Sequence, residues 1–434
     1  MVLSPLLTAI MSATVKKIPI PKNGVDYRGK VVLAPMVRSG ECPSRLMALK
    51  YGADLVWGPE TIDKALIGTT RRENAATKTV DFTRPASNGG GKHPTLQGQP
   101  RENLIYRLCP EREGRRLIYQ IGTSDPDTAV RAAQLIARDV AGIDVNAGCP
   151  KPFSTLGGMG AALLKKPDTL CAILTALVRD VGVPHQIGIS VKIRILDTAE
   201  QTSSLVRRLC ATGITGLTVH CRTTPMRPRQ PAVREQLRAV AAACREAGVA
   251  CLMNGDVASR DEAQRLVAEY GVDGAMIATA AENNPSVFRP ASLGGRAPWE
   301  KVVREYVETA LEVENHLGNT KYLLGQMIPG KSALYNTMAA TKSYADLVRG
   351  LGYADLMRAA DDVDRRLELG AYEKPKLTKA ERKAANKAAA KSAEKTRGVG
   401  VKRSAETAEL DLPLEQAREQ GLARVPDNAS ALAV

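Results

Sequence analysis

A chain of 434 residues predicts two to three domains, since a domain typically holds about 100–200 residues. Its 44% hydrophobic and 25% charged residues are ordinary for a soluble globular protein, and no stretch approaches the roughly 18 uncharged apolar residues of a membrane span. The 8 cysteines and 4 histidines include no C-x-x-C pair, which argues against a disulfide scaffold and a structural zinc site, so we expect no metal.

The positive charge is concentrated near the C-terminus. The formal net charge is +15, and residues 374–404 hold 11 Lys or Arg against 2 Asp or Glu, which accounts for +9 of it. This excess suggests a polyanionic partner, although a basic tail that binds nothing in particular would give the same charge. We expect residues 371–434 to be a basic, disordered tail and residues 1–28 to be an N-terminal extension. Because residues 1–28 do not resemble a signal peptide, we expect a cytoplasmic protein, with the nucleus as the alternative.

Between residues 29 and 290, apolar runs alternate with amphipathic segments. Eight runs predict strands, at 31–37, 53–57, 117–121, 142–146, 187–194, 216–220, 249–253 and 273–278, and helices are expected at 125–140, 167–181, 198–212, 233–247 and 259–270. Nearly continuous apolar runs are typical of parallel strands buried on both faces. Eight βα units in about 250 residues match an α/β fold of the TIM (β/α)8 barrel type. A doubly wound open sheet is the alternative, but the segment 34–37 lacks the glycine-rich turn that such a sheet would need.

Two other regions depart from this alternation. Residues 64–116 are too long for a plain connection between a strand and a helix, so we predict an insertion that is exposed around residues 84–101. Residues 291–370 predict an all-helical C-terminal domain, with helices at 299–317, 321–327, 332–338, 343–349 and 353–369.

Polar side chains stand at the ends of six consecutive predicted strands. In a TIM barrel these ends and the loops after them build the site. The residues are Gln120, Asn146, Lys192 with Arg194, His220 with Arg222, Asn254 with Asp256, and Thr279. One polar group at a strand end is a common accident, whereas six in succession indicate a ring around a ligand.

Two turns in this ring suit a phosphate group. The turn Asn254-Gly255-Asp256 and the pair Ala278-Thr279 each precede a predicted helix, where small residues let backbone N–H groups approach an anion. An ordinary tight turn is the alternative for the first of them.

Lys192, His220 and Cys149 are candidates for chemistry. A lysine inside a strand is costly to bury unless it is paired, and a cofactor that becomes negative on reduction would pair Lys192; a lysine that reaches solvent is the alternative. For His220, a structural and a functional role are equally open. A thiol with a pKa near ~8.5 is mostly protonated at neutral pH, so Cys149, on a loop after a strand, can donate a proton. A small buried hydrophobe is the alternative, and we expect that role for Cys171, Cys210 and Cys244.

Several blocks of sequence resemble one enzyme family, the tRNA-dihydrouridine synthases, and within it the eukaryotic subgroup that acts at position 20 of the D-loop. The blocks are Ala34-Pro35-Met36-Val37, Cys109-Pro110-Glu111-Arg112-Glu113, Gln120-Ile121-Gly122-Thr123-Ser124-Asp125, Asp144-Val145-Asn146-Ala147-Gly148-Cys149-Pro150-Lys151, Ser154-Thr155-Leu156-Gly157-Gly158-Met159-Gly160, Val191-Lys192-Ile193-Arg194, Val219-His220-Cys221-Arg222, Asn254-Gly255-Asp256 and Asn319-Thr320-Lys321-Tyr322. The resemblance extends over about residues 29–367.

The resemblance implies an FMN-binding TIM barrel over 29–290, a tRNA-binding helical domain over 291–370, NADPH as reductant and a protein that we expect to be a monomer. Each matching residue then has an implied role. Pro35, Met36 and Val37 would lie along the flavin; Gln120, Lys192 and His220 would contact its ring system and ribityl side; Asn254, Gly255, Asp256, Ala278 and Thr279 would hold its phosphate; and Cys149 would be the proton donor.

The chain departs from the family pattern at Thr279, where the family often has an arginine. Arg222 or the backbone would then have to compensate, or flavin would bind more weakly. Two other functions stay open: an FMN-dependent barrel that reduces a small pyrimidine or enone, and a flavin-free RNA-binding protein on a degenerate barrel.

Overall fold

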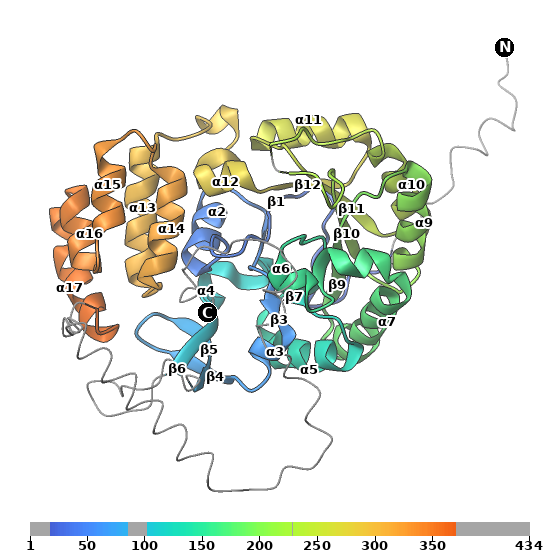
Figure 1. The fold of residues 1–434 in the computed structure, drawn as a ribbon, viewed down its shortest axis with the longest axis horizontal. Coiled ribbons are helices and arrows are strands. Elements are labelled where there is room, and N and C mark those ends of the chain that lie inside the picture. The colour runs from blue at the N-terminus through green and yellow to red at the C-terminus, as the bar shows by residue number, and fades with distance from the viewer. Residues whose placement is uncertain (1–17, 86–101, 228, 370–434) are drawn as a thin grey trace, which may run out of the picture. The chain divides into compact units, whose positions relative to one another are not determined.

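The computed structural model describes residues 18–85, 102–227 and 229–369, and its centre is a closed parallel barrel (Figure 1). The eight strands are β1 (Val31–Leu33), β2 (Leu55–Trp57), β7 (Leu117–Gly122), β8 (Gly142–Ala147), β9 (Gly188–Arg194), β10 (Gly216–His220), β11 (Ala250–Asn254) and β12 (Gly274–Ile277). Each strand pairs in parallel with its neighbours, and pairing of β2 with β7 closes the ring. The short β3 (Thr61–Ile62) lies beside the end of β7. The prediction of a TIM barrel is confirmed.

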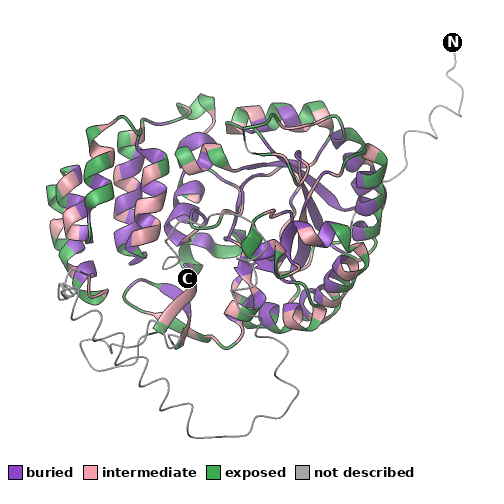
Figure 2. Ribbon diagram, in the orientation of Figure 1, coloured by how far each residue is buried: buried purple, intermediate pink, exposed green. Residues whose placement is uncertain are grey.

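Helices cover the outside of the barrel because their apolar faces are buried when they pack against the strands. They are α2 (Cys42–Lys50), α5 (Pro126–Ile136), α7 (Pro167–Leu177), α9 (Ala199–Cys210), α10 (Leu237–Ala247) and α11 (Arg260–Tyr270). Figure 2 shows that the helix faces turned toward the strands are buried and the opposite faces exposed. Most strand bounds lie within one or two residues of the prediction. The first strand ends earlier than expected, at Leu33, so that Pro35, Met36 and Val37 lie in the loop that follows it. Proline fits there because it has no backbone N–H to donate to a neighbouring strand.

The insertion after the second strand folds into a small antiparallel sheet that the sequence analysis did not predict. Its strands are β4 (Thr70–Asn74), β5 (Thr79–Pro85) and β6 (Glu102–Leu108), followed by α4 (Pro110–Glu113). Alternate residues bury one face: Val80 and Phe82 on β5, and Tyr106 and Leu108 on β6. Most of the stretch 84–101 that was expected to be exposed lies outside the described residues.

The C-terminal region is helical, as predicted. Its helices are α13 (Trp299–Glu312), α14 (Leu317–Met327), α15 (Ala333–Ala340), α16 (Tyr344–Leu351) and α17 (Met357–Arg366), after the short α12 (Thr279–Asn283) that follows the last strand. These helices and the barrel belong to one compact unit that ends at Leu369. A domain boundary near residue 290 stays a prediction. The predicted tail at 371–434 and the first 17 residues of the predicted N-terminal extension lie outside the described residues.

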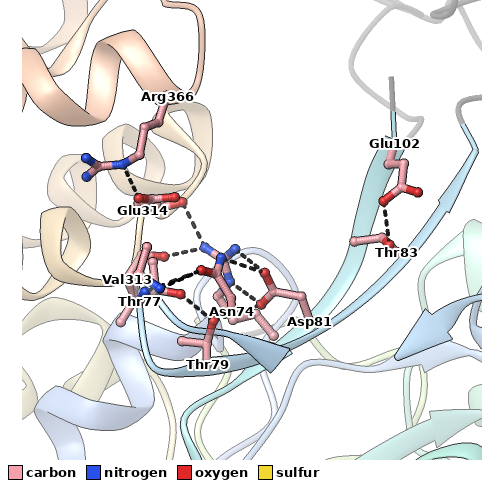
Figure 3. A network of polar contacts seen from close by, with 11 residues as sticks. Asn74, Thr77, Thr79, Asp81, Thr83, Glu102, Val313, Glu314 and Arg366 are labelled. Carbon is pink, nitrogen blue, oxygen red and sulfur yellow. Dashed lines mark hydrogen bonds and ion pairs between the residues drawn. The ribbon is translucent and has the colours of Figure 1, made fainter. Parts of the chain in front are cut away.

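Arg107 links the inserted sheet to the helical region, and Figure 3 shows its partners Asp81, Val313 and Glu314. The guanidinium of Arg107 on β6 forms two 2.6 Å contacts with the carboxylate of Asp81 on β5. It also donates to the carbonyl oxygens of Val313 and, at 3.0 Å, of Glu314, which follow α13. The Glu314 carboxylate in turn binds Arg366 on α17. The inserted sheet is therefore joined to the helical region through the largely buried guanidinium of Arg107.

None of the helices in the described ranges combines the length and apolarity that a bilayer crossing requires.

Candidate active site at the carboxyl end of the barrel

The predicted site residues come together at the carboxyl ends of the strands. A pocket of about 300 Å³ is lined by Ala34, Pro35, Met36, Val37, Glu60, Gln120, Asn146, Gly148, Cys149, Lys151, Lys192, Arg194, His220, Asn254, Ala278, Thr279, Glu282 and Tyr322. An adjoining pocket of about 470 Å³ shares five of these residues and adds Gly255 and Asp256. Together the two have the size and mixed lining typical of a cofactor site. All twelve residues predicted from the sequence therefore lie on one continuous site, while their individual roles stay predictions.

A chain of buried amides fixes the loop that carries Cys149. Asp144 on β8 accepts hydrogen bonds from Gln120 Nε2 at 2.8 Å and from Ser190 Oγ at 2.7 Å. Gln120 Oε1 then accepts from Asn146 Nδ2 at 3.1 Å. Asn146 Oδ1 accepts the backbone N–H groups of Gly148 and Cys149 at 3.0 and 2.9 Å. Because each amide is held at both ends, the loop has one preferred conformation.

The Cys149 thiol is half-buried on the pocket wall, and all eight cysteines are free. Burial raises the pKa of Cys149 to about 11, and the nearby carboxylate of Glu60 contributes. The thiol therefore stays protonated throughout the physiological range, which is the form that a proton donor needs.

Lys192 on β9 is a half-buried cation that faces the pocket without an anion bound to it. Among the described residues it has neither a hydrogen bond nor an ion pair within 4.0 Å. Burial, together with the guanidinium charge of Arg194, lowers the pKa of Lys192 to about 8, and the Asp144 carboxylate only partly opposes this. An anionic or hydrogen-bond-accepting ligand would remove this cost.

His220 is neutral in this setting. Burial first, and then the positive charges of Lys192, Arg194 and Arg222, lower the pKa of His220 to about 2. Its Nε2 lies 3.3 Å from Arg222 Nη1, and since a guanidinium can only donate, Nε2 accepts. The Nδ1 nitrogen then carries the ring's single proton.

The turn at Gly255 and Asp256 lines the adjoining pocket. Arg234 Nη2 donates to the carbonyl oxygens of Gly255 at 3.1 Å and of Asp256 at 2.7 Å. In a trans peptide the N–H points opposite to the carbonyl, so the N–H groups of Asp256 and Val257 face away from Arg234. Both residues line the adjoining pocket. Gly255 has a φ of +123°, a conformation that glycine adopts without strain.

Arg222 is already engaged by the protein. It forms an ion pair with Asp256 at 2.6 Å and donates to the carbonyl oxygen of Gln230 at 2.7 Å. It therefore supports the turn rather than standing free as a substitute for the arginine that Thr279 replaces.

The helical region contributes one wall of the pocket mouth. Tyr322 on α14 lines the pocket, and the guanidinium of Arg38, from the loop after β1, lies 4.4 Å from the centre of its ring. Glu282 on α12 lines the same wall and accepts from Ser39. Entry to the pocket is thus shared by the barrel and the helices.

Known proteins are similar to this chain in sequence over most of its length. A model of the dihydrouridine synthase (Dus) family matches residues 95–392. The chain is 48% identical over 326 residues to a Saccharomyces cerevisiae protein named tRNA-dihydrouridine(20) synthase (NAD(P)+), which covers 74% of this chain and 82% of the relative. The chain belongs to the dihydrouridine synthase family.

Two further relatives are named for the same position and for neighbouring positions of tRNA. A Schizosaccharomyces pombe protein, also named tRNA-dihydrouridine(20) synthase (NAD(P)+), is 47% identical over 74% of this chain, which spans 65% of that relative, slightly under two thirds. A Mus musculus protein named tRNA-dihydrouridine(20a/20b) synthase (NAD(P)+)-like is 29% identical over 65% of this chain and 75% of the relative.

Several residues of this dihydrouridine synthase pocket were not among the predicted site residues. Glu60 and Glu282 were not considered, Tyr322 was named only within a family-like block, and Asn146 and Arg194 were named as strand-end residues without a role. The strand-end rule would have found Glu60, since it follows the second strand after Gly58 and Pro59. The family-like block that contains Tyr322 marks this residue, but the strand-end rule does not place a residue of a distant helix at the barrel mouth. The described residues contain no group of three or more His, Cys, Asp or Glu side chains that could bind a metal ion.

Proposed function

We propose that this protein reduces the C5=C6 bond of uridine 20 in the D-loop of tRNA to dihydrouridine, with bound FMN and with NADPH as reductant. The observation that carries the proposal is the Cys149 thiol, protonated and half-buried, on the same pocket as Lys192 and His220. Family membership supports the reaction. The higher identity to the two relatives named for position 20 than to the relative named for positions 20a and 20b, 48% and 47% against 29%, supports the position.

The residues present fit a flavin. Lys192 is a pocket-facing cation that lacks an anion, and His220 is neutral and can donate through Nδ1. The N–H groups of Asp256 and Val257 face the adjoining pocket, where they would hold a phosphate without the arginine that Thr279 replaces. A flavin, once bound and reduced, supplies a hydride to a carbon atom. Lys192 would stabilise negative charge on the ligand, an electrostatic role.

The chain's own chemical step is a proton transfer. The C5=C6 bond of uracil is conjugated to the C4 carbonyl, so addition of hydride at C6 leaves negative charge over C5 and O4. The Cys149 thiol would then give its proton to C5: the S–H bond breaks, a C–H bond forms, and a thiolate remains. A thiol with a pKa of about 11 keeps its proton until that charge develops.

A tRNA substrate accounts for the shared mouth of the pocket. The target base must leave the stacked RNA to reach a barrel interior. Tyr322 and Arg38 place an aromatic ring and a guanidinium at the entrance, and both group types stack on exposed bases. An enzyme for free uracil would not need a residue of the helical region at this position.

The test uses purified protein, NADPH and an unmodified tRNA transcript, with dihydrouridine at position 20 as the readout. Cys149→Ala should abolish product formation and keep the flavin absorbance. Cys171→Ala is the matched control, because Cys171 is also half-buried but lies on α7 outside the pocket, and it should be active. Equal turnover of free uracil would favour a small-molecule reductase, and a protein purified without flavin absorbance would favour a flavin-free RNA-binding role. Comparison of NADPH with NADH identifies the reductant.

A further inference from the structure

Glu60 is an acid in the pocket that the proton transfer described above does not use. It lies just after β2, and its Oε1 accepts a hydrogen bond from Ser154 Oγ at 2.8 Å. Its Oε2 is buried and has no hydrogen-bond partner among the described residues. A buried carboxyl oxygen without a hydrogen-bond partner costs folding free energy. Its position on the pocket wall beside Cys149 therefore points to a functional role.

Two glycines near Glu60, Gly122 and Gly160, leave no room for a side chain beside its carboxyl group or the Cys149 loop. A Cβ at Gly122 would lie 2.7 Å from Glu60 Oε1, so any side chain there would displace the carboxyl group. A Cβ at Gly160 would lie 2.5 Å from both the Cys149 carbonyl oxygen and Ser154 Oγ. Two glycines therefore allow the Cys149 loop to close over Glu60, with the fully buried Ser154 as the link.

We propose that Glu60 is a positioning residue for Cys149: as a carboxylic acid it returns a proton to the sulfur after each turnover, and as a carboxylate, at the alkaline pH where the thiol titrates, its charge disfavours the thiolate. The proposal rests on the proposed function, because it assumes that Cys149 gives up its proton. In the return step the O–H bond of the Glu60 carboxylic acid breaks and the S–H bond of Cys149 re-forms. The Glu60 carboxylate then takes a proton from water, and the cycle is balanced.

The acidities of the two groups favour this direction. Burial raises the pKa of Glu60, which favours the protonated acid, and the Ser154 hydrogen bond only partly opposes it. A thiolate whose conjugate acid has a pKa of about 11 is a far stronger base than a carboxylate, so the proton moves toward sulfur.

The other charges around Cys149 act against Glu60. Lys151, on the same loop, lowers the pKa of the thiol, and Lys192 and Arg194 on β9 also interact with the sulfur and favour the thiolate. Burial and Glu60 outweigh these three cations. Removal of the Glu60 charge should therefore let the cations pull the thiol pKa down.

The first test measures the Cys149 thiol directly and needs no tRNA. The rate of alkylation by iodoacetamide is followed against pH in a Cys171→Ala background, because Cys171 is the other half-buried cysteine. Glu60→Gln should lower the alkylation pKa from about 11 toward the ordinary value near ~8.5. Glu73→Gln, at a carboxylate with 78% of its side chain exposed on the inserted sheet, should leave it unchanged. An unchanged pKa in Glu60→Gln overturns the proposal.

The second test measures turnover on tRNA. Glu60→Gln should lower kcat by roughly 10-fold to 100-fold with an unchanged KM, since the acid acts after substrate binding. The alkaline limb of the pH–rate profile of Glu60→Gln should move to lower pH.

The two ideas fail in different ways. A normal kcat for Glu60→Gln, or an unchanged thiol pKa, overturns the role of Glu60 while the proposed function stands. Full activity of Cys149→Ala overturns the proton-donor assignment itself, whatever the thiol titration shows.

Discussion

Replacement of Asn146 by alanine should uncouple the thiol loop from the buried amide chain. The side chain is 8% exposed and makes three hydrogen bonds, one to Gln120 and two to the backbone N–H groups of Gly148 and Cys149. Alanine removes all three and leaves Gln120 Oε1 buried without its donor. No other described side chain replaces these contacts.

The expected cost follows from the count of lost partners. At about 0.5–1.5 kcal/mol for each hydrogen bond, with the half-buried Cys149 N–H free to reach water, the unfolding free energy should fall by about 2–4 kcal/mol. A displacement of the thiol by about 1 Å should slow the single-turnover reaction roughly 100-fold. The rate should therefore fall even where the protein remains folded.

Denaturant unfolding followed by tryptophan fluorescence measures the first effect, because Trp57 is only 1% exposed in the barrel core. Rapid-mixing reduction of tRNA by the pre-reduced enzyme measures the second. Asn146→Asp is the matched control: it keeps the acceptor for both backbone N–H groups, loses the donor to Gln120 and adds a carboxylate charge. It should retain more of the rate than alanine does. An alanine variant as fast as wild type, or an aspartate variant as slow as alanine, would refute the role of the backbone contacts.

Three more outcomes are expected. Arg45→Ala should lower the unfolding free energy by about 3–5 kcal/mol in a denaturant titration, because its ion pair with Glu113 at 2.5 Å is 1% exposed on both sides and the carboxylate would be left without its cation. Arg107→Ala should raise KM for tRNA more than it lowers flavin binding, since it unties the helical region from the inserted sheet. His220→Gln should make stability less dependent on pH between 7 and 5: the folded pKa of His220 is about 2, so protons bind the unfolded chain first and wild-type stability falls with pH below about 6.5. An equal pH dependence of the two proteins contradicts the buried, neutral histidine.

The barrel was predictable because its signals are local. Each strand is a short apolar run, and the polar residue that ends it is found from sequence order alone, as at Gln120, Lys192 and His220. Parallel topology then brings all strand ends to one rim, so a linear pattern becomes a three-dimensional site. The loop position of Pro35 follows equally locally, from its missing N–H.

The rest depends on contacts between distant segments. In the inserted sheet, Val80 pairs with Leu108 and Phe82 with Tyr106, across more than fifteen intervening residues. Nothing in the intervening sequence marks the partner residues. Tyr322 reaches the pocket through the packing of α14, which the pattern of that helix does not encode. The charge of Lys321 alone would suggest contact with an anion. Its ammonium group instead donates to the carbonyl oxygens of Ala339 and Thr341.

The distribution of charge around the pocket orients a ligand. Lys192 and Arg194 lie on β9 and Arg222 follows β10, whereas Glu60 and Glu282 in the first pocket come from the β2 and β12 sides. In the adjoining pocket Asp256 is paired with Arg222. An anionic phosphate is attracted toward the first group and repelled from the second. A neutral base is then left the space beside Glu60 and Cys149. The cations of β9 and β10 that keep His220 neutral thus also attract an anionic ligand, whereas Glu60 lies on the β2 side of the thiol.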